Sequence, residues 1–410
     1  MRQPHRRNSA WCRAVGGAIF VILLAACQPA DFEVGAVEFQ APAGMAPNLT
    51  TVGDQVVLSW LEPSRDGQHA LRLAVRDGTT WRPVGTVVEN DSLFVNWADF
   101  PSVLGLSDGR WVAHWLQKTA PSTYAYHVKL AISNDRGATW GEPFVPHGDR
   151  SPTEHGFVAM VPWEGGAALA WLDGRRTGSG AESDAGNADR GAMTVRFTTL
   201  GTDGLPAPDI EVDDRACDCC QNDMALTSRG LVLVFRDRSP EEIRDIALAR
   251  YSDGEWARPM KVADDGWYYP GCPVNGPAVA AAGDTVVVAW YTAADGPRVY
   301  AAISSDGGAT FGPRIRVDGG KPTGRTDVAM LPGGGAVVSW IEEADDAGKI
   351  VIRRIAFDGR AGPVQVVAST TTARAAGFPR LTRVRDHVVV AWTQPGEGGG
   401  VRVASVRPRG

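Results

Sequence analysis

The sequence predicts an all-β protein, a β-propeller of four-stranded blades, and two observations carry this prediction. A β-branched run that ends in an aromatic residue recurs seven times at intervals of 50 to 64 residues, ending at Trp60, Trp115, Trp171, Phe235, Trp290, Trp340 and Trp392. Each unit also holds further short segments of alternating pattern, separated by turns rich in Gly and Asp, with no helical period between them. Repeats of this length indicate propeller blades. We therefore expect one ring of seven blades.

The composition fits a repeated, turn-rich chain. The 410 residues include 48 Gly and 27 Pro, both above the average usage of about 7% and 5%. The 14 Trp outnumber the 12 Phe and the 7 Tyr, and the repeated aromatic position accounts for six of them. Length alone would suggest two or three domains, whereas the repeats predict a single domain over residues 33–410.

The last unit needs a strand from elsewhere in the chain. From Phe378 to about Val406 it offers only three strand segments. The segment Glu33–Gln40, EVGAVEFQ, alternates in polarity and belongs to no earlier unit. We expect this N-terminal strand to complete the last blade, because closure removes the exposed strand edges of an open ring.

The N-terminus has the pattern of an export signal. Residues 1–13 hold four Arg and no acidic residue, and an apolar run follows from Ala14 to Ala26. The run ends in Leu24-Ala25-Ala26-Cys27, which resembles a bacterial lipobox. The resemblance implies that residues 1–26 are a removed signal peptide, that Cys27 is lipidated, and that residues 27–32 form a tether. An ordinary secretory signal with an incidental Cys is the alternative.

Export and charge limit the expected partners. The resemblance to lipoproteins implies a lipid-anchored protein of the bacterial cell envelope, and Gln28 after the Cys favours the outer membrane if the cell is Gram-negative. The formal net charge is −6 and no Lys/Arg cluster is present, which argues against nucleic acid binding. No apolar run after residue 27 reaches the roughly 18 residues of a membrane span. We expect a monomer that contacts the membrane through its lipid anchor only.

A turn motif occurs in two full copies that fit S-x-D-x-G-x-T-[WF], at residues 133–140 and 304–311, with shortened copies at residues 77–81 and 252–256. It resembles the Asp box, or BNR repeat, of sialidases, and the resemblance covers nearly the whole mature chain. It implies a sialidase-like propeller, and since sialidases have six blades, six is the alternative to seven. We expect structural roles, away from any site, for Ser133, Asp135, Gly137, Trp140, Ser304, Asp306, Gly308 and Phe311.

The repeat also predicts a functional face. In a propeller the first strand of each unit lines the central channel, and its leading residues meet the loops that follow the aromatic-ended strands. The candidates at these positions are Glu154, Arg175, Asp223, Arg236, Asp237, Asn275, Tyr291, Arg325, Asp327 and Arg380, with Asn48, Glu62, Asp99, His155, Asp173 and Glu342 in equivalent places. Several Arg and carboxylates in one concavity suit an anionic or polyhydroxylated ligand. The alternative is that most are solvated rim residues.

Four cysteines of the mature chain fall in the same positions. Cys217, Cys219 and Cys220 lead the fourth unit, and Cys272 leads the fifth. We expect the four thiols to be neighbours that wall the main pocket. In an oxidising compartment they would form two disulfides, in any of three pairings. Alternatively, three or four of them would bind Cu or Zn.

The resemblance to sialidases implies an activity that the sequence supports only partly. That mechanism uses three Arg on the substrate carboxylate, a Tyr nucleophile paired with a Glu, and an Asp acid/base. Arg236, Arg325 and Arg380 approximate the Arg set by repeat position, but the F/Y-R-I-P motif is absent. We expect glycan or anionic-ligand binding, with sialidase-type glycoside hydrolysis as the enzymatic option. The alternative is a non-catalytic propeller whose cysteines bind a metal or support redox chemistry or partner binding.

Overall fold

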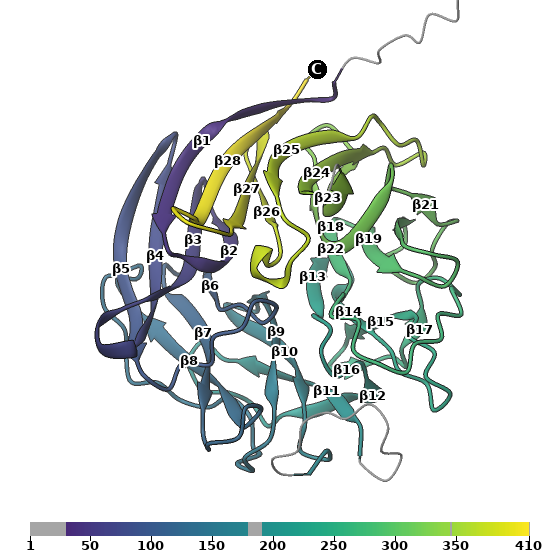
Figure 1. Cartoon of the computed structure of the whole chain (residues 1–410). Helices are drawn as coiled ribbons and strands as arrows, with labels where there is room; N and C mark the ends of the chain where they lie inside the picture. The colour runs from purple at the N-terminus through teal and green to yellow at the C-terminus, as the bar shows by residue number, and fades with distance from the viewer. Residues whose placement is uncertain (1–29, 179–190, 345–346, 410) are drawn as a thin grey trace, which may run out of the picture.

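The computed structural model describes residues 30–178, 191–344 and 347–409. The predicted signal peptide, residues 1–26, and the lipidation site Cys27 lie outside these ranges. Seven antiparallel sheets stand around a ring (Figure 1), so the prediction of seven blades is confirmed and the six-blade alternative is wrong. Within the described ranges, no helix is long and apolar enough to cross a membrane.

The blades are numbered here in chain order, each from its inner to its outer strand. Blade 1 consists of β2 (Met45–Val52), β3 (Gln55–Pro63), β4 (His69–Asp77) and β5 (Thr80–Asn90), with the 3-10 turn η1 (Arg65–Gly67). Blade 2 consists of β6 (Ser102–Gly105), β7 (Trp111–Lys118) and β8 (Tyr126–Ser133). Blade 3 consists of β9 (His155–Trp163), β10 (Gly166–Asp173), β11 (Met193–Leu200) and β12 (Ile210–Ala216).

Blades 4 to 6 continue the same order. Blade 4 consists of β13 (Asp223–Thr227), β14 (Gly230–Arg236), β15 (Ile246–Ser252) and two short outer strands, β16 (Glu255–Trp256) and β17 (Met260–Lys261), which both pair with β15. Blade 5 consists of β18 (Ala278–Ala282), β19 (Thr285–Thr292), β20 (Arg298–Ser304) and β21 (Ile315–Arg316). Blade 6 consists of β22 (Lys321–Met330), β23 (Ala336–Ala344), β24 (Ala347–Ile355) and β25 (Gln365–Thr370).

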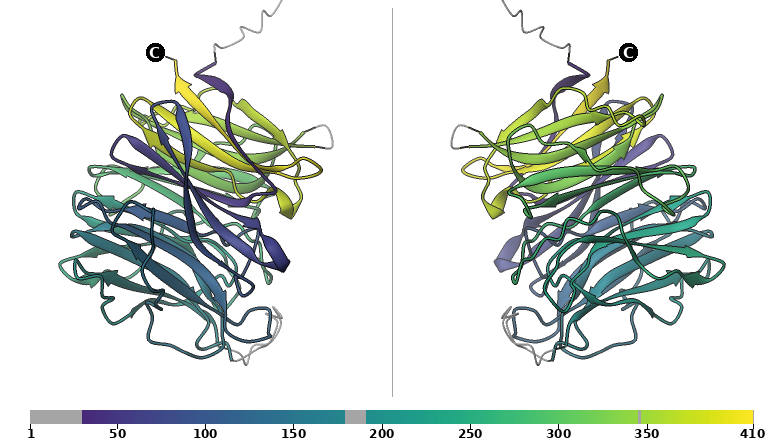
Figure 2. Two further views of the ribbon diagram at one scale, coloured as in Figure 1. Left: turned by 90° about the vertical axis from the view of Figure 1, so that its left-hand side faces the viewer. Right: turned by 90° about the vertical axis from the view of Figure 1, so that its right-hand side faces the viewer.

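Blade 7 is built from both ends of the described chain. Its three inner strands are β26 (Arg380–Val384), β27 (His387–Gln394) and β28 (Gly400–Pro408), preceded by the 3-10 turn η2 (Arg374–Ala376). The outer strand is β1 (Phe32–Pro42), which pairs with β28 from Phe32↔Pro408 to Pro42↔Gly400. Figures 1 and 2 show β1 (purple) beside β28 (yellow). The predicted closure by the N-terminal strand is therefore confirmed.

Blade 2 departs from the four-stranded pattern. Where an outer strand would stand, residues 141–149 form no regular ladder with β8. Their backbone pairs with it at one isolated bridge, Leu130↔Phe144, and through the N–H of Gly141, which donates to the carbonyl of Ile132 at 2.9 Å. Pro143 and Pro146 flank Phe144 on both sides. A proline has no N–H to donate to a ladder, so the segment cannot pair as a regular strand. It runs on as a loop toward the start of β9.

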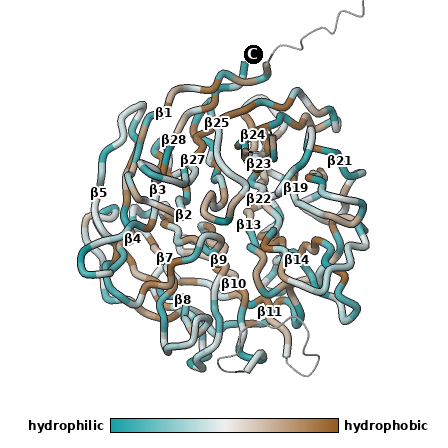
Figure 3. The backbone as a smooth tube through the Cα atoms, viewed as in Figure 1, coloured by the Kyte–Doolittle hydropathy of each residue, from teal (hydrophilic) through white to brown (hydrophobic). Residues whose placement is uncertain are grey.

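The core lies between the blades. Each hydrophobic cluster joins neighbouring sheets, as where Val287 and Ala289 of blade 5 pack with Val338 and Trp340 of blade 6. All seven repeated aromatics lie in second strands and are buried. Figure 3 shows the hydrophobic colour along the strands and the hydrophilic colour in many peripheral loops. The Trp excess is thus a consequence of one repeated packing position.

The Asp boxes form the hairpin turns after β8 and β20 with matching hydrogen bonds. The carboxylate of Asp135 accepts the backbone N–H of Thr139 at 2.8 Å, and that of Asp306 accepts the N–H of Thr310 at 2.9 Å. The hydroxyl of Ser133 accepts the N–H of Gly137 at 2.7 Å, as that of Ser304 accepts the N–H of Gly308 at 2.9 Å. Both glycines have positive φ, of 86° and 81°. These turns lie on the face opposite to the one where the inner strands begin, which we call the site face.

Candidate functional site

A carboxyl and a phenol meet on the site face between blades 2 and 3. The hydroxyl of Tyr126, the first residue of β8, donates to Oε1 of Glu154 at 2.6 Å. Glu154 directly precedes β9 and is held by an N–H from Gly174 to its carbonyl at 2.7 Å. Tyr126 is 1% exposed and stacks on Phe94 at 4.0 Å, whereas Glu154 is half-buried. The Tyr126 hydroxyl therefore fixes one oxygen of the carboxyl, and no described residue hydrogen-bonds the second oxygen.

The surroundings of Glu154 favour its protonated form. Burial raises the pKa of Glu154 to about 8, and the negative charges of Asp99 and Asp218 add to the shift. Burial also raises the pKa of Asp99 to about 7. One oxygen of Asp99 accepts the N–H of Phe157 at 2.8 Å, and the other has no partner among the described residues. At neutral pH Glu154 is thus a neutral acid that can donate a proton.

A second carboxylate comes from the lead-in to blade 4. Asp218 lies inside the loop closed by the disulfide Cys217–Cys220, and the disulfide Cys219–Cys272 ties this loop to the lead-in of blade 5. Arg238 donates to Asp218 at 3.1 Å and to Glu242 at 2.7 Å, and Arg244 also pairs with Glu242 at 2.7 Å. Burial raises the pKa of Asp218, against the opposing charge of Arg238.

The four thiols are neighbours, as the repeat predicted, and they brace this part of the site face. The structure selects one of the three open pairings and does not join the adjacent Cys219 and Cys220. The sulfurs of Cys217, Cys219 and Cys220 lie close enough for a shared metal ion. In the disulfide form, however, they are not thiolates and cannot serve as the Cu or Zn ligands that the sequence offered as an alternative.

Three predicted residues line the central channel instead. A cavity of about 300 Å³ brings together Asp223, Asp327 and Arg380 with Asn48. Nε of Arg380 lies 3.1 Å from Oδ1 of Asn48 and 3.4 Å from Oδ2 of Asp327. Burial raises the pKa of Asp223 to about 6, and Asp327 adds to the shift.

The channel carboxylates also join neighbouring blades. Oδ2 of Asp223 accepts the N–H of Val279 in blade 5 at 2.9 Å, and Oδ2 of Asp327 accepts the N–H of Leu381 in blade 7 at 2.7 Å. Blades 2 and 3 are joined in the same way, because Asp99, which precedes blade 2, accepts the N–H of Phe157 in blade 3. Much of the polarity predicted for the channel therefore holds the ring together.

The expected arginine set does not assemble. Arg236 is buried and donates to the carbonyls of Asn275 at 2.8 Å and Tyr291 at 2.6 Å, with its guanidinium over Trp267. Arg325 is buried and donates to the carbonyls of Thr372 and Ala373, both at 2.9 Å. Burial lowers the pKa of Arg236 to about 9 and of Arg325 to about 10. Donors satisfied by backbone carbonyls are not available to a substrate carboxylate.

The remaining predicted residues are dispersed. Arg175 pairs with Asp173 at 2.7 Å and with Asp209 at 3.1 Å. Asp237 lines a separate cavity of about 440 Å³ between blades 3 and 4. The side chain of Asn275 accepts the backbone N–H of Arg325 at 2.7 Å, and Tyr291 packs edge-on against Trp267. Among the described residues, none of these side chains hydrogen-bonds the carboxyl of Glu154.

The acidic residues after the repeated tryptophans have a structural use that the sequence did not reveal. The indole N–H groups of Trp60, Trp171 and Trp340 donate to the carboxylates two residues later, at 2.8 to 2.9 Å. The acceptors are Glu62, Asp173 and Glu342. A buried indole N–H needs a partner, so these carboxylates serve the packing of the blades.

Another cavity holds no ionisable group. About 560 Å³ in volume, it is lined by Met45, Trp97, Thr393 and the neighbouring loops of blades 7 and 1, with no ionisable side chain in its wall. It offers apolar space for a ligand near the site face.

Two residues of the site were missed by sequence reasoning. Tyr126 opens a third strand, whereas the repeat predicts site residues only at the start of first strands and in the loops after second strands. Asp218 stands between the cysteines of Cys217-Asp218-Cys219-Cys220, so attention to the residue inside the motif would have found it.

No protein-family model matches the chain, and no curated protein matches it in sequence. Among solved structures, the polysaccharide lyase Uly1 is similar with a TM-score of 0.54 at 9% identity, over 90% of this chain and 91% of that one. A mutant of the NanB sialidase from Streptococcus pneumoniae gives 0.47 at 10% identity, over 86% and 83%. The Trypanosoma rangeli sialidase gives 0.49 at 12% identity, over 79% and 56%. The chain thus shares its overall fold with Uly1.

Proposed function

We propose that this protein binds a glycan on the site face and cleaves a glycosidic bond there, with Glu154 as the proton donor. The observation that carries the proposal is the half-buried carboxyl of Glu154, which accepts the Tyr126 hydroxyl at 2.6 Å and whose pKa burial raises to about 8. A glycosidic oxygen is a poor leaving group unless it is protonated as the bond breaks. A carboxyl that is neutral at pH 7 and open on one side supplies that proton.

Asp218 is the second carboxylate that such a reaction needs. Its negative charge is one cause of the raised pKa of Glu154. Once Glu154 has given up its proton, Asp218 assists the attacking water or stabilises positive charge on the sugar ring. Arg238, which bridges Asp218 and Glu242, adds a cation suited to an acidic sugar.

The proposed substrate is not bound through an arginine triad of the sialidase kind. Arg236 and Arg325 donate to backbone carbonyls, so the cation that we assign to substrate binding is Arg238, which pairs with Asp218. This favours an internal acidic or neutral residue of a polysaccharide over a terminal sialic acid. The polysaccharide lyase Uly1 and the sialidases share the scaffold and support only the general class of ligand.

The proposal is tested with the disulfide-intact domain, residues 28–410, incubated with neutral, uronic-acid-containing and sulfated polysaccharides and a fluorogenic sialoside. New reducing ends in at least one glycan, lost in Glu154→Gln and retained in the exposed control Glu255→Gln, are the expected result. Binding without cleavage would remove the catalytic role of Glu154, and neither binding nor cleavage would overturn the proposal.

A further inference from the structure

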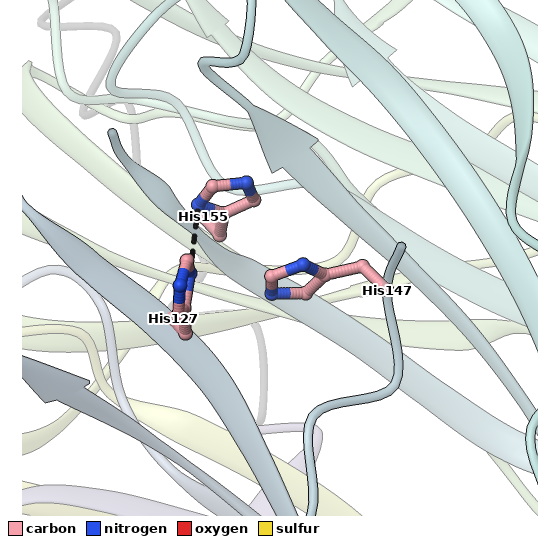
Figure 4. A group of neighbouring side chains, drawn as sticks. All are labelled: His127, His147 and His155. Carbon is pink, nitrogen blue, oxygen red and sulfur yellow. Dashed lines mark hydrogen bonds between the residues drawn. The ribbon is translucent and has the colours of Figure 1, made fainter. Parts of the chain in front are cut away.

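Three histidines meet below the site face, from three separate segments. His127 lies on β8, His147 on the loop that replaces the outer strand of blade 2, and His155 begins β9 (Figure 4). They are 6%, 2% and 0% exposed. One nitrogen from each lies within 4.8 Å of the others, and the ring centroids are 4.2 to 4.9 Å apart. Buried imidazole nitrogens this close together can share one ligand, such as a metal ion.

The distances between the nitrogens suit coordination. Nδ1 of His127 lies 3.4 Å from Nδ1 of His155. Two nitrogens bound tetrahedrally to one zinc ion at about 2.0–2.1 Å are roughly 3.4 Å apart. Figure 4 shows the ring of His147 directed toward the other two from the opposite side.

In His147 and His155, the ring nitrogen that would not bind the metal already has a hydrogen-bond acceptor, as in known metal sites. Nδ1 of His147 lies 2.9 Å from the carbonyl oxygen of Asp149, and Nε2 of His155 lies 2.9 Å from its carboxylate. A ligating histidine usually donates its other N–H to such an acceptor. This leaves Nε2 of His147 for the metal, and that buried atom has no hydrogen-bond partner among the described residues.

The charges around the cluster are compatible with a cation. The carboxylates of Asp149 and Asp173 lie 2.9 and 3.6 Å from Nε2 of His155.

Two features must change when a metal binds. The rings of His147 and His155 are stacked in parallel at 4.2 Å, so one of them must turn to bring both nitrogens onto one ion. A hydrogen bond of His155 must also be given up. Nδ1 of His155 also lies 3.1 Å from the carbonyl oxygen of Thr153 and 3.2 Å from that of Tyr126. These carbonyls accept its proton in the metal-free protein. Binding then releases that proton, as ligand deprotonation requires.

We propose that His127, His147 and His155 bind one divalent transition metal ion such as Zn(II). Asp149 orients the rings of His147 and His155 by accepting hydrogen bonds from them. Three imidazole ligands leave one position for water or a ligand atom, the arrangement of catalytic zinc sites. The cluster is next to Glu154 in the chain, but the proposal does not depend on glycan cleavage.

The test is Zn(II) binding to the chelator-treated domain in its oxidised form, measured by competition with a chromophoric chelator. One equivalent is expected to bind. His147→Ala and His127→Ala should weaken binding at least 100-fold, and Asp149→Asn about 10- to 100-fold. The matched control is His69→Ala, a half-buried histidine on β4 outside the cluster, which should bind as the wild type does.

Two further measurements keep the result decisive. Co(II) should give the absorption of a tetrahedral nitrogen-ligated site in the wild type, so the assignment survives even if a ligand variant fails to fold. Failure of the oxidised protein to bind Zn(II) or Co(II) overturns the proposal. Binding that appears only after reduction, or that persists in a folded His127→Ala/His147→Ala variant, assigns the metal to the cysteines and also overturns it.

Discussion

Glu154 differs from the other acidic residues at repeat positions through its neighbours alone. Glu62 and Glu342 accept an indole N–H, and Asp223 and Asp327 accept backbone N–H groups from the next blade. Among the described residues, the carboxyl of Glu154 accepts a hydrogen bond only from a tyrosine hydroxyl, and the charges of two further carboxylates raise its pKa. An acidic residue thus serves packing, ring closure or, as we propose for Glu154, proton transfer, according to what the fold places beside it.

The raised pKa values of Glu154 and Asp99 predict a pH-dependent stability. Both groups bind protons more tightly in the folded state, so their contribution is full below about pH 4 and is lost as the pH rises through about 7 to 8. The melting temperature should therefore fall between about pH 5 and about pH 9. In Asp99→Asn/Glu154→Gln this slope should flatten, measured by thermal unfolding. An unchanged slope in the double variant would contradict the assignment.

Buried Asp327 gives a second test, of the contact between blades 6 and 7. Asp327→Ala leaves the N–H of Leu381 without its acceptor, which should cost about 1–3 kcal/mol of the free energy of unfolding. Asp327→Asn keeps one acceptor oxygen and should lose less. Chemical denaturation measures both, and equal losses in the two variants would show that the hydrogen bond is not the cause.

The strands were the most predictable part of the chain, because their alternation and the repeated aromatic position depend on local sequence. Even the closing strand β1 was predictable, because its alternating segment belongs to no repeat unit. The missing fourth strand of blade 2 was not predicted, although Pro143 and Pro146 are visible in the sequence. Both prolines lack the N–H that a ladder needs, and the resulting loop carries His147.

Closure by β1 predicts an asymmetric response along that strand. Phe32 is 1% exposed and packs into the cluster between blades 6 and 7, whereas Val37 on the same strand is 43% exposed. Phe32→Ala should lower the free energy of unfolding by about 3–5 kcal/mol, and Val37→Ala by less than about 0.5 kcal/mol. Denaturant titration of the two variants checks this. Similar small losses would mean that the ring does not depend on β1.

The ring as a unit could be predicted from spacing alone, but its sites could not. Tyr126 and Glu154 are 28 residues apart, and Asp218 comes from another blade. The three histidines come together only because a loop replaces a strand. Such juxtapositions depend on how neighbouring blades dock, which no single repeat encodes.

The position of the protein in the cell is a further prediction. The lipobox-like sequence before Cys27 predicts incorporation of labelled palmitate in a bacterial host and recovery with the membrane fraction. Cys27→Ser should abolish both, since stable anchoring needs the acyl chains. Labelling of the Ser variant, or a soluble wild-type protein, would contradict the prediction.

Proton donation by Glu154 is tested most directly by kcat and KM for an oligosaccharide that the wild-type protein cleaves. Glu154→Gln should lower kcat about 10²- to 10⁴-fold with KM nearly unchanged, and the wild-type rate should fall as the pH rises through about 8. A Glu154→Gln variant with the wild-type kcat and pH profile would show that the proton comes from elsewhere.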